Sequence, residues 1–346
     1  MAAAAAILSL FLAVHLLPPC SAAAPSPYLS PTTLLLNYQN MLTTFKIFIC
    51  TPYTPFEFPD APASLFYNSL LRSPFLTLNP AEAHLFFVPF SPYISTRSMA
   101  RVVRELRSDF PYWNRTLGAD HFFVSPAGID YSSDRNILEL KKNSIQISVF
   151  PVVSGYFIPH KDITLPPSAG SPLDLFHGAE NSTKTSILGY LRWDGKTELN
   201  LVNELKLDSD FVIEDKSKQL ESSRSFRESK FCLFLYHGEV ARIVEAMASG
   251  CVPVVIVDRP VQDLPLMDVL RWSDLALVVA VPHSGAKRLK QILSEVSEEK
   301  IAEMREMVVA ASKHLVWNEE AQAMDAFNML MYQLWLRRHA VRYARR

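Results

Sequence analysis

One predicted helix carries charged residues at a spacing that suits anion binding. Glu239, Arg242 and Glu245 lie three residues apart, so their side chains share one face of a helix expected at 239–249. A buried strand expected at 231–235 leads into this helix, which places the first helical turn at the carboxyl edge of a sheet, where a phosphate binds favourably. Two interpretations are open. The charges form an exposed ladder of ion pairs, or Arg242 faces a diphosphate while a carboxylate accepts ribose hydroxyls.

The strand–helix–strand unit around these charges has its own pattern. Phe231–Leu235 is an unbroken apolar run, which is typical of a strand buried on both faces. In the helix, apolar residues recur at the i, i+3, i+4, i+7 spacing of one buried face. Gly250 suits a left-handed C-cap, and Val252–Val257 predicts a second buried strand. The charged face of the helix is therefore held by a well-defined βαβ unit.

The rest of the chain alternates short apolar runs with amphipathic segments, which predicts a mostly parallel α/β fold. A stretch rich in Pro, Ser and Gly, without periodicity, separates two such series and indicates a linker. The first series contains strands expected at Lys46–Cys50, Leu85–Val88, His121–Val124 and Gln146–Phe150. The predicted divisions are a targeting segment (1–23), an α/β domain (44–160), a linker (161–186), a second α/β domain (187–320) and a C-terminal helix (321–346).

Composition excludes several classes of protein. The chain has 346 residues with 49% hydrophobic and 20% charged residues, which is enough apolar material for sizeable cores and argues against disorder. A net charge of -1 removes the basic footprint of a general nucleic-acid binder. Four cysteines are too few for a disulfide scaffold.

The N-terminal segment predicts entry into the secretory pathway. Ala2–Leu17 is almost wholly apolar and is followed by small residues, as in a signal peptide or a signal-anchor. No Lys or Arg precedes Lys46, so the sequence leaves both alternatives open. Two sequons, at Asn114 and Asn181, fit glycosylation in a lumenal setting.

Several segments between Lys46 and Val316 carry motifs that are specific when taken together. They are Phe75–Ala83 with Phe86–Pro89, Pro111–Arg115, Gly118–Phe123, Lys230–Val254 and Asp268–Ser273. In these motifs and in their order the chain resembles the plant exostosin-like glycosyltransferases of family 47. The resemblance implies a GT-B fold, in which two Rossmann-like domains face each other across a cleft. It also implies inverting transfer of a sugar from a nucleoside diphosphate donor, expected to be UDP, to a cell-wall or matrix polysaccharide in the Golgi.

The resemblance also directs attention to particular residues. Such folds hold the leaving diphosphate with basic side chains and a helix N-terminus, and they require no metal or other cofactor. The nucleotide-sugar is a substrate, the acceptor is a glycan, and a complex with other Golgi glycosyltransferases is a further expectation. The donor-binding candidates are Lys230, Gly238, Glu239, Arg242, Glu245 and Arg192.

Inverting displacement requires a base for the acceptor hydroxyl. His160 and Asp162 lie at the expected domain junction, where a cleft would form, and His121 begins a predicted strand. These three residues are the candidates for this role. For each, the alternative is a structural histidine or a capping carboxylate.

The chain departs from the family pattern at two places. Relatives have two more residues between the positions of Glu239 and Arg242, and a longer arginine-rich segment around Arg192. Loss of cations beside a diphosphate would reduce transition-state stabilisation. Two alternatives to an active enzyme therefore remain, a degenerate lumenal protein of the same fold that acts as a partner subunit, and a carbohydrate-binding protein.

Two further features have simple interpretations. Asp208-Ser209-Asp210 looks like the metal-binding Asp-x-Asp of another glycosyltransferase fold, but it lies in a polar turn and we interpret it as a surface loop. Cys232 and Cys251 lie on neighbouring elements; we expect buried thiols, with a disulfide as the alternative in an oxidising lumen.

Overall fold

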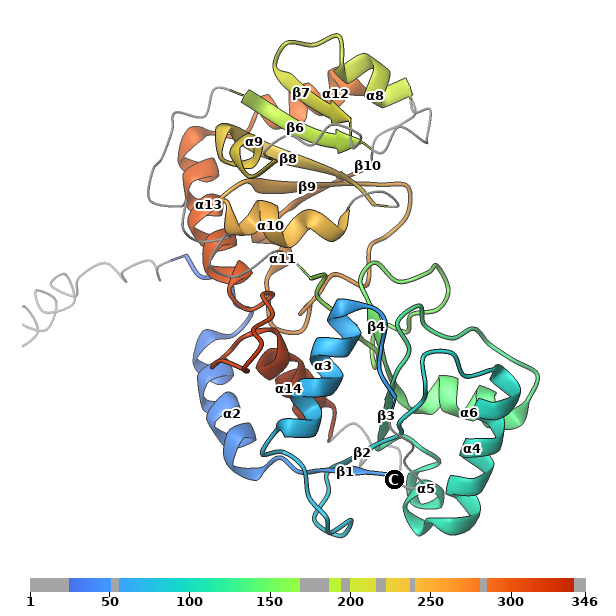
Figure 1. Ribbon diagram of the computed structural model, residues 1–346. Coiled ribbons are helices and arrows are strands. Elements are labelled where there is room, and N and C mark those ends of the chain that lie inside the picture. Colours follow the sequence, from blue (N-terminus) through green and yellow to red (C-terminus); the bar gives the residue numbers. More distant parts are fainter. Residues whose placement is uncertain are drawn as a thin grey trace, which may run out of the picture.

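The computed structural model shows two α/β lobes, one above the other (Figure 1). It describes residues 25–50, 56–168, 187–193, 200–215, 222–236, 240–280 and 285–338. The predicted targeting segment 1–23 and the sequon at Asn181 lie outside these residues. The predicted α/β fold with two facing domains is confirmed, because each lobe is built on its own parallel sheet.

The first sheet runs in the order β1-β2-β3-β4-β5, and every neighbouring pair is parallel. Side chains alternate between its two faces. Phe87 and Phe122 face one core, whereas Phe86 and Phe123 face the other, so that β2 and β3 are buried on both sides. The strands are β1 (Ile47–Ile49), β2 (Leu85–Phe87), β3 (His121–Val124), β4 (Ile145–Val149) and β5 (Ile163–Leu165).

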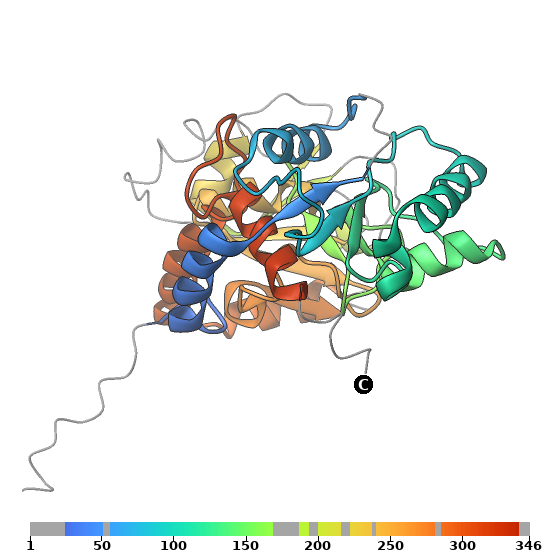
Figure 2. The ribbon, with the colours of Figure 1, turned by 90° about the horizontal axis from the view of Figure 1, so that it is seen from below.

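Helices cover both faces of this sheet. The core on one face includes residues of α2 (Pro31–Thr44), α3 (Ala61–Arg72) and α14 (Ala326–Arg337). The core on the other face includes residues of α4 (Thr96–Asp109), α5 (Pro111–Thr116) and α6 (Arg135–Asn143). The last helix, α14, thus returns to the first lobe, where it lies beside α2 (Figure 2).

The first lobe extends beyond its predicted limits at both ends. Helix α2 precedes residue 44, and its buried residues belong to the same core as the sheet. Strand β5 lies inside the predicted linker 161–186, yet it pairs with β4 along Ile147–Val149. The sequence pattern missed β5 because three residues are too few to show a period.

The second sheet has the order β10-β9-β8-β6-β7 and is also parallel throughout. Its strands are β6 (Ile187–Trp193), β7 (Phe211–Asp215), β8 (Ser229–Leu235), β9 (Val252–Val257) and β10 (Leu277–Ala280). The helices of this lobe are α8 (Asn200–Leu205), α9 (Ser222–Glu228), α10 (Ile243–Ala248), α11 (Trp272–Leu275), α12 (Ala286–Ser294) and α13 (Glu298–Ser312).

The segment after β8 differs from the predicted helix. A 3-10 turn, η1 (Val240–Arg242), precedes the α-helix, which begins only at Ile243. Arg242 has φ -85° and ψ 6°, outside the α-helical range, so the backbone changes its geometry at this residue. The entrance predicted to bind phosphate includes Gly238 and Glu239, which lie outside the described residues.

A disulfide joins the two sides of this segment. Cys232 on β8 and Cys251, directly before β9, are bonded with a Cα–Cα distance of 5.8 Å. Our expectation of two free thiols was therefore wrong. The two cysteines meet because the parallel strands place Cys232 beside Pro253, close to Cys251. The bond closes the loop that contains η1 and α10.

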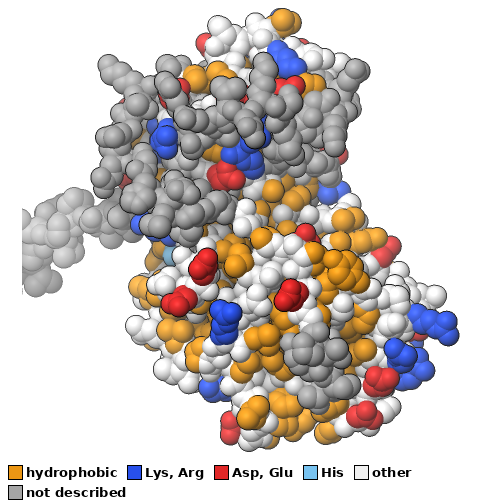
Figure 3. Space-filling view, in the orientation of Figure 1, with side chains coloured by type: hydrophobic (Ala, Val, Ile, Leu, Met, Phe, Trp, Pro, Cys, Tyr) orange, Lys and Arg blue, Asp and Glu red, His pale blue; other side chains and the backbone are white. Residues whose placement is uncertain are grey.

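The two lobes are joined through specific polar contacts. Tyr236, directly after β8, donates its hydroxyl to Asp263, and the other oxygen of Asp263 accepts from the backbone N–H of Val152 at 2.8 Å. Arg337 on α14 donates to the backbone oxygens of Lys161 and Asp162 and forms an ion pair with Asp268. In Figure 3, hydrophobic side chains are also visible where the lobes meet. These contacts join the two lobes directly and through α14.

Candidate functional site

The carboxyl edge of the second sheet carries a cluster of polar side chains. Tyr190 and Arg192 lie two residues apart on β6, so they share one face of the sheet. Arg192 is in register with Glu214 on β7. The hydroxyl of Tyr190 donates to Glu214 at 2.6 Å, and Ser225 on α9 donates to the other oxygen of Glu214 at 2.8 Å. The carboxylate is thus held at a fixed position.

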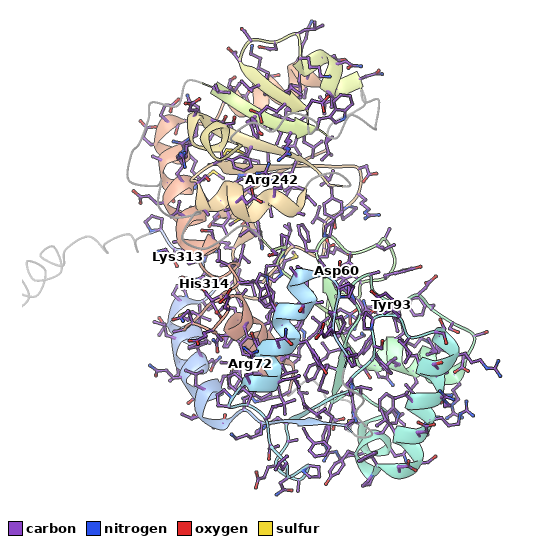
Figure 4. The ribbon with its side chains drawn as sticks, viewed as in Figure 1. Asp60, Arg72, Tyr93, Arg242, Lys313 and His314 are labelled. Carbon is purple, nitrogen blue, oxygen red and sulfur yellow. A yellow bond between two sulfur atoms is a disulfide. The ribbon has the colours of Figure 1, made fainter. Side chains whose placement is uncertain are left out.

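Arg242 is linked to the same cluster through Phe226 of α9. Its guanidinium lies over the ring of Phe226, 5.0 Å from the centroid, and Phe226 packs edge-on against Tyr190. Nε and Nη2 both donate to Glu245, the former at 2.9 Å. The third nitrogen, Nη1, is buried and has no hydrogen-bond partner within the part of the chain that the structure describes. Figure 4 shows Arg242 on the second lobe, close to α10.

The electrostatics of Tyr190 keep its phenol neutral. Burial raises the pKa of Tyr190 strongly, and the hydrogen bond to Glu214 raises it further. The positive charges of Arg242 and Arg192 oppose these effects. The phenol therefore stays protonated and donates its hydrogen bond to Glu214.

The contact between Arg242 and Glu245 settles one part of the sequence interpretation. The ion pair predicted by their spacing is present, but the side chains are only 18% and 24% exposed. It is therefore not an exposed ladder. Glu245 orients the guanidinium and leaves Nη1 without a partner, and a buried N–H in this state costs free energy that a ligand oxygen would recover. Nη1 is therefore the donor of this cluster to examine for a ligand contact.

The first lobe presents exposed residues at the carboxyl edge of its own sheet. Asp60 precedes α3 and makes no side-chain capping bond, and Tyr93 follows β2 with 79% of its side chain exposed. Figure 4 shows both at the end of the first lobe that faces the second. Tyr131, which follows β3, is also exposed. Sequence reasoning missed these residues, although the rule that ligands bind beyond the carboxyl ends of parallel strands would have found them.

His121, a candidate base, lies in the core at the amino end of β3. It is 1% exposed, its ring stacks on Phe86, and Trp113 packs edge-on against it. Nδ1 lies 2.8 Å from Asp120. Burial lowers the pKa of His121, and the contact with Asp120 offsets part of this effect. The structure gives His121 no access to a substrate, because its strand begins at the edge away from the other lobe.

His160 and Asp162 are also at the wrong edge for the proposed reaction. They precede β5, and Asp162 is buried, with its oxygens accepting from the backbone N–H groups of Gln146 and Ile158 and from Lys161. His160 is exposed nearby. Their assignment assumed that the domain junction begins at residue 160. Because β5 extends the sheet to Leu165, this segment instead completes the amino edge of the first lobe.

The donor-binding candidates are divided in the same way. Arg192, Arg242 and Glu245 lie at the carboxyl edge, whereas Lys230 is the second residue of β8, at the amino edge. There it pairs with Glu298, which begins α13. Lys230 and Arg242 lie at opposite edges of the sheet because the seven residues of β8 run from one edge to the other.

The two remaining motifs have local contacts. The carboxylates of Asp208 and Asp210 both pair with Lys290, at 2.8 and 2.7 Å, so an ammonium group lies where the Asp-x-Asp interpretation would have a metal. Within the described residues there is no group of three or more metal-ligating side chains. Asn114 is exposed on α5, where its amide donates to the backbone oxygen of Arg107 at 2.9 Å.

The fold and the site together define a class, that of two-lobed α/β proteins with a cationic cluster at the carboxyl edge of the second sheet. Comparison with known proteins identifies the family. Residues 62–296 match the exostosin GT47 domain, which covers more than half of the chain. The chain therefore belongs to the exostosin GT47 family.

Relatives from plants agree with this assignment. The chain is 31% identical over 294 residues to a probable glycosyltransferase of Arabidopsis thaliana, covering 78% of this chain and 61% of that protein. A second such protein is 30% identical, with 87% and 64% covered. A probable beta-1,4-xylosyltransferase of Arabidopsis thaliana is 28% identical, with 76% and 71% covered. The chain thus spans less than two thirds of the length of the first two relatives.

Among solved structures, the chain is similar to WaaG, a glycosyltransferase involved in lipopolysaccharide biosynthesis. The TM-score is 0.38 at 10% identity, with 83% of this chain and 98% of that one covered. This TM-score is below 0.5, and the fold assignment depends on the two parallel sheets described above.

Proposed function

We propose that the protein is an inverting glycosyltransferase that moves a sugar from a nucleoside diphosphate donor, UDP in the first instance, to a cell-wall or matrix polysaccharide. Membership of the exostosin GT47 family supports the reaction class. The names of the xylosyltransferase and glucuronosyltransferase relatives support a pentose or a uronic acid as the sugar.

One observation supports the position of the donor above all others. Nη1 of Arg242 is buried and unpaired in the described structure, while Nε and Nη2 are held by Glu245. A diphosphate oxygen at Nη1 would receive a charge-assisted hydrogen bond from a guanidinium that is already oriented. Arg192 supplies a second positive charge beside the same tyrosine. The leaving diphosphate would thus meet two cations whose positions are set before it binds.

The acceptor is proposed to bind on the opposing lobe. Tyr93 and Tyr131 expose aromatic side chains, and Asp60 presents a carboxylate, at the carboxyl edge of the first sheet. Sugar rings pack on aromatic side chains, and a polymer would lie along such an edge. Asp60 therefore replaces His121, His160 and Asp162 as the carboxylate to test for an acceptor contact.

We further propose that the protein works in the lumen of the Golgi, attached to the membrane through its N-terminal segment. The apolar run Ala2–Leu17 supports a targeting or anchoring role. The disulfide between Cys232 and Cys251 supports an oxidising compartment, because disulfides persist there and are rare in the cytosol.

The experiment is a calorimetric titration of the purified chain with UDP. Arg242→Ala should weaken binding by about 10- to 100-fold, the loss expected for hydrogen bonds to a charged group. Lys230→Ala is the matched control, because it removes a cation from the same lobe at the opposite edge of the sheet and should leave UDP affinity unchanged. Equal effects of the two variants would contradict the proposed donor site.

Turnover separates an active enzyme from a partner subunit. The wild-type chain should hydrolyse or transfer sugar from at least one of UDP-xylose, UDP-glucuronic acid and UDP-galactose, measured as UDP release. UDP binding that depends on Arg242 without turnover of any donor would favour the degenerate subunit. Glycan binding without nucleotide affinity would contradict both.

A further inference from the structure

Helix α2 has an unusual surface for a helix on the outside of a folded protein. The chain contains 34 Lys+Arg and 35 Asp+Glu, yet none of them precedes Lys46. The uncharged stretch therefore includes the whole of α2 and continues to the start of the first strand. A surface helix usually carries charged residues opposite its buried face, so the outer face of α2 calls for a different explanation.

The outer face of α2 is also rich in exposed leucine. Leu34, Tyr38 and Met41 point into the core, whereas Leu35, Leu36 and Leu42 are 56%, 60% and 48% exposed. The exposed leucines are thus not needed to fill the first lobe. Leu29, two residues before the helix, is likewise exposed. Together these four side chains form an apolar surface, which we call the α2 face.

The polar residues of the last turn are partly masked. The hydroxyl of Thr44 donates to the backbone oxygen of Asn40 at 2.6 Å. The hydroxyl of Thr43 lies within hydrogen-bond distance of the backbone oxygens of Gln39 and Asn40, at 3.3 and 3.1 Å. Hydroxyls that bond within their own helix demand less from the surrounding solvent, as in helices that contact lipid. Gln39 and Asn40, which are exposed on the same helix, keep amide groups that water or lipid headgroups would bind.

The segment that precedes α2 indicates what covers the α2 face. The segment before α2 is fixed to the second lobe, because Leu29 N–H donates to Val269 at 2.9 Å and Arg271 N–H donates to Pro27 at 2.8 Å. The apolar run ends at Leu17, eight residues before Pro25, where the described structure begins. Eight residues span at most roughly 28 Å. A bilayer that holds the apolar run would therefore lie within reach of α2.

We propose that the α2 face rests on the lipid bilayer in which the preceding apolar run is inserted. The helix has 14 residues, or about 21 Å, which is shorter than the roughly 30 Å hydrocarbon core. Within the described residues no helix is long and apolar enough to cross a membrane. Helix α2 therefore lies along the surface, with its leucines among the lipid headgroups. This inference rests on the membrane attachment proposed above.

The consequence is a fixed orientation of the enzyme on the membrane. Because α2 packs on α14 and joins the core of the first lobe, while the segment before it binds the second lobe, docking of the α2 face would hold both lobes at a defined angle to the bilayer.

The test uses the full chain reconstituted in phosphatidylcholine vesicles. Leu36→Cys, in a Cys20→Ser background, is labelled with an environment-sensitive fluorophore; Cys50 is buried and Cys232 and Cys251 are bonded. The matched control is Leu207→Cys, an exposed leucine on the second lobe. The label at residue 36 should shift to shorter wavelength, and lipid-borne spin labels should quench it at least about twofold more than the label at residue 207.

The remaining outcomes overturn the proposal in distinguishable ways. If the vesicles carry the protein on flotation but the label at residue 36 is quenched no more than the control, attachment holds and docking of α2 fails. If the protein does not float with the vesicles, attachment itself fails and the docking fails with it. A blue shift without lipid that grows with protein concentration would assign the α2 face to a second copy of the chain. UDP affinity, measured on the same samples, tests the proposed function separately.

Discussion

The two lobes share one plan, a five-stranded parallel sheet between helices, but they differ in where the polar clusters described above lie. In the first lobe the buried pairs Asp120–His121 and Lys161–Asp162 lie at the amino edge, where strands begin. In the second lobe Arg192 and Arg242 lie at the carboxyl edge. If the proposed donor site is correct, strand direction, rather than residue type, separates structural from functional polar residues in this chain.

The physical reason lies in what each edge offers. The polar groups at the amino edge of the first lobe are enclosed, and each is bonded to its neighbours. Asp120 alone accepts from Arg115 at 2.6 Å, from Thr116 at 2.5 Å and from His121 at 2.8 Å. At the carboxyl edge of the second lobe, Nη1 of Arg242 keeps a donor without a partner in the described structure. Saturated bonding stabilises the fold, whereas the unsatisfied donor is where the proposed site would bind its diphosphate.

Removal of Asp120 is the most direct test of whether the amino edge of the first lobe serves only stability. Asp120→Ala leaves the donors of Arg115, Thr116 and His121 without their acceptor in a site that is 4% exposed. We expect a loss of about 3 to 5 kcal/mol in the free energy of unfolding, measured by urea titration with tryptophan fluorescence. Once folded, the variant should bind UDP as the wild type does.

The exposed Asp109, on α4 of the same lobe, provides the control. Asp109→Ala should change the free energy of unfolding by less than about 0.5 kcal/mol. A stable Asp120→Ala protein that has lost UDP binding would mean that the amino edge of the first lobe serves the reaction, contrary to the comparison.

Removal of the disulfide should have the next largest effect. It should lower both the free energy of unfolding and the affinity for UDP. Cys232 and Cys251 are 19 residues apart and enclose η1 and α10, with Arg242 between them. Closing a loop of this length stabilises a protein by about 3 kcal/mol. We expect the Cys232→Ser, Cys251→Ser double variant to lose about this much and to bind UDP more weakly, because Arg242 is no longer held on a closed loop.

Replacement of Cys50, which is buried in the first lobe, separates the two effects. Cys50→Ser should lower the free energy of unfolding without changing the affinity of the folded protein for UDP. If the double variant keeps full UDP affinity, the closed loop contributes to stability alone.

The sequence predicts the long buried strands of this structure better than the short ones. Long apolar runs such as Phe231–Leu235 and Val252–Val257 predict buried strands correctly. A strand that is buried on both faces needs an apolar residue at nearly every position, so the run itself is the signal. Short strands such as β5 carry no such signal. The first domain was therefore predicted to end at residue 160, although β5 belongs to the same sheet as β4.

The site was harder to predict because spacing along the chain gives no direction in space. Arg242 and Glu245 were found from their spacing of three, which holds in the helical segment. His160 and Asp162 lie at the predicted domain junction and Lys230 lies in a family motif, but neither position indicates at which edge of a sheet the residue stands. The pairing of Tyr190 with Glu214 joins two strands and has no signature in one sequence.

A smaller effect is expected from Arg192, the second cation of the proposed site. It lies on β6 beside Glu214 and opposes the high pKa of Tyr190 together with Arg242. Its side chain is partly exposed, so solvent screens its charge. Arg192→Ala should weaken UDP binding by roughly fivefold, or about 1 kcal/mol. An effect larger than that of Arg242→Ala would move the centre of the site toward the end of β6.

The smallest expected effect is the pH dependence of stability in the first lobe. Burial lowers the pKa of His121, so the unfolded chain takes up a proton before the folded chain does. The contribution of this residue to stability is therefore complete above about pH 6.5, the ordinary value, and is lost as the pH falls toward the folded pKa. Burial alone would raise the pKa of Asp120, but hydrogen bonds from His121, Thr116 and Arg115 outweigh it and hold the pKa below its ordinary value. Its contribution is lost only in stronger acid.

Because His121 and Asp120 lose their contributions to stability in different pH ranges, the effect of His121 can be measured by itself. Between pH 7.5 and 5 the urea midpoint of the wild type should fall, and His121→Gln should show a shallower slope whatever its absolute stability. His160→Gln, which alters an exposed histidine of the same lobe, should keep the wild-type slope. UDP affinity should not follow this slope, because the residue responsible lies at the amino edge of the other sheet. A UDP affinity that fell in parallel with the slope would link His121 to the donor site, and the separation of the two edges would no longer describe how the protein works.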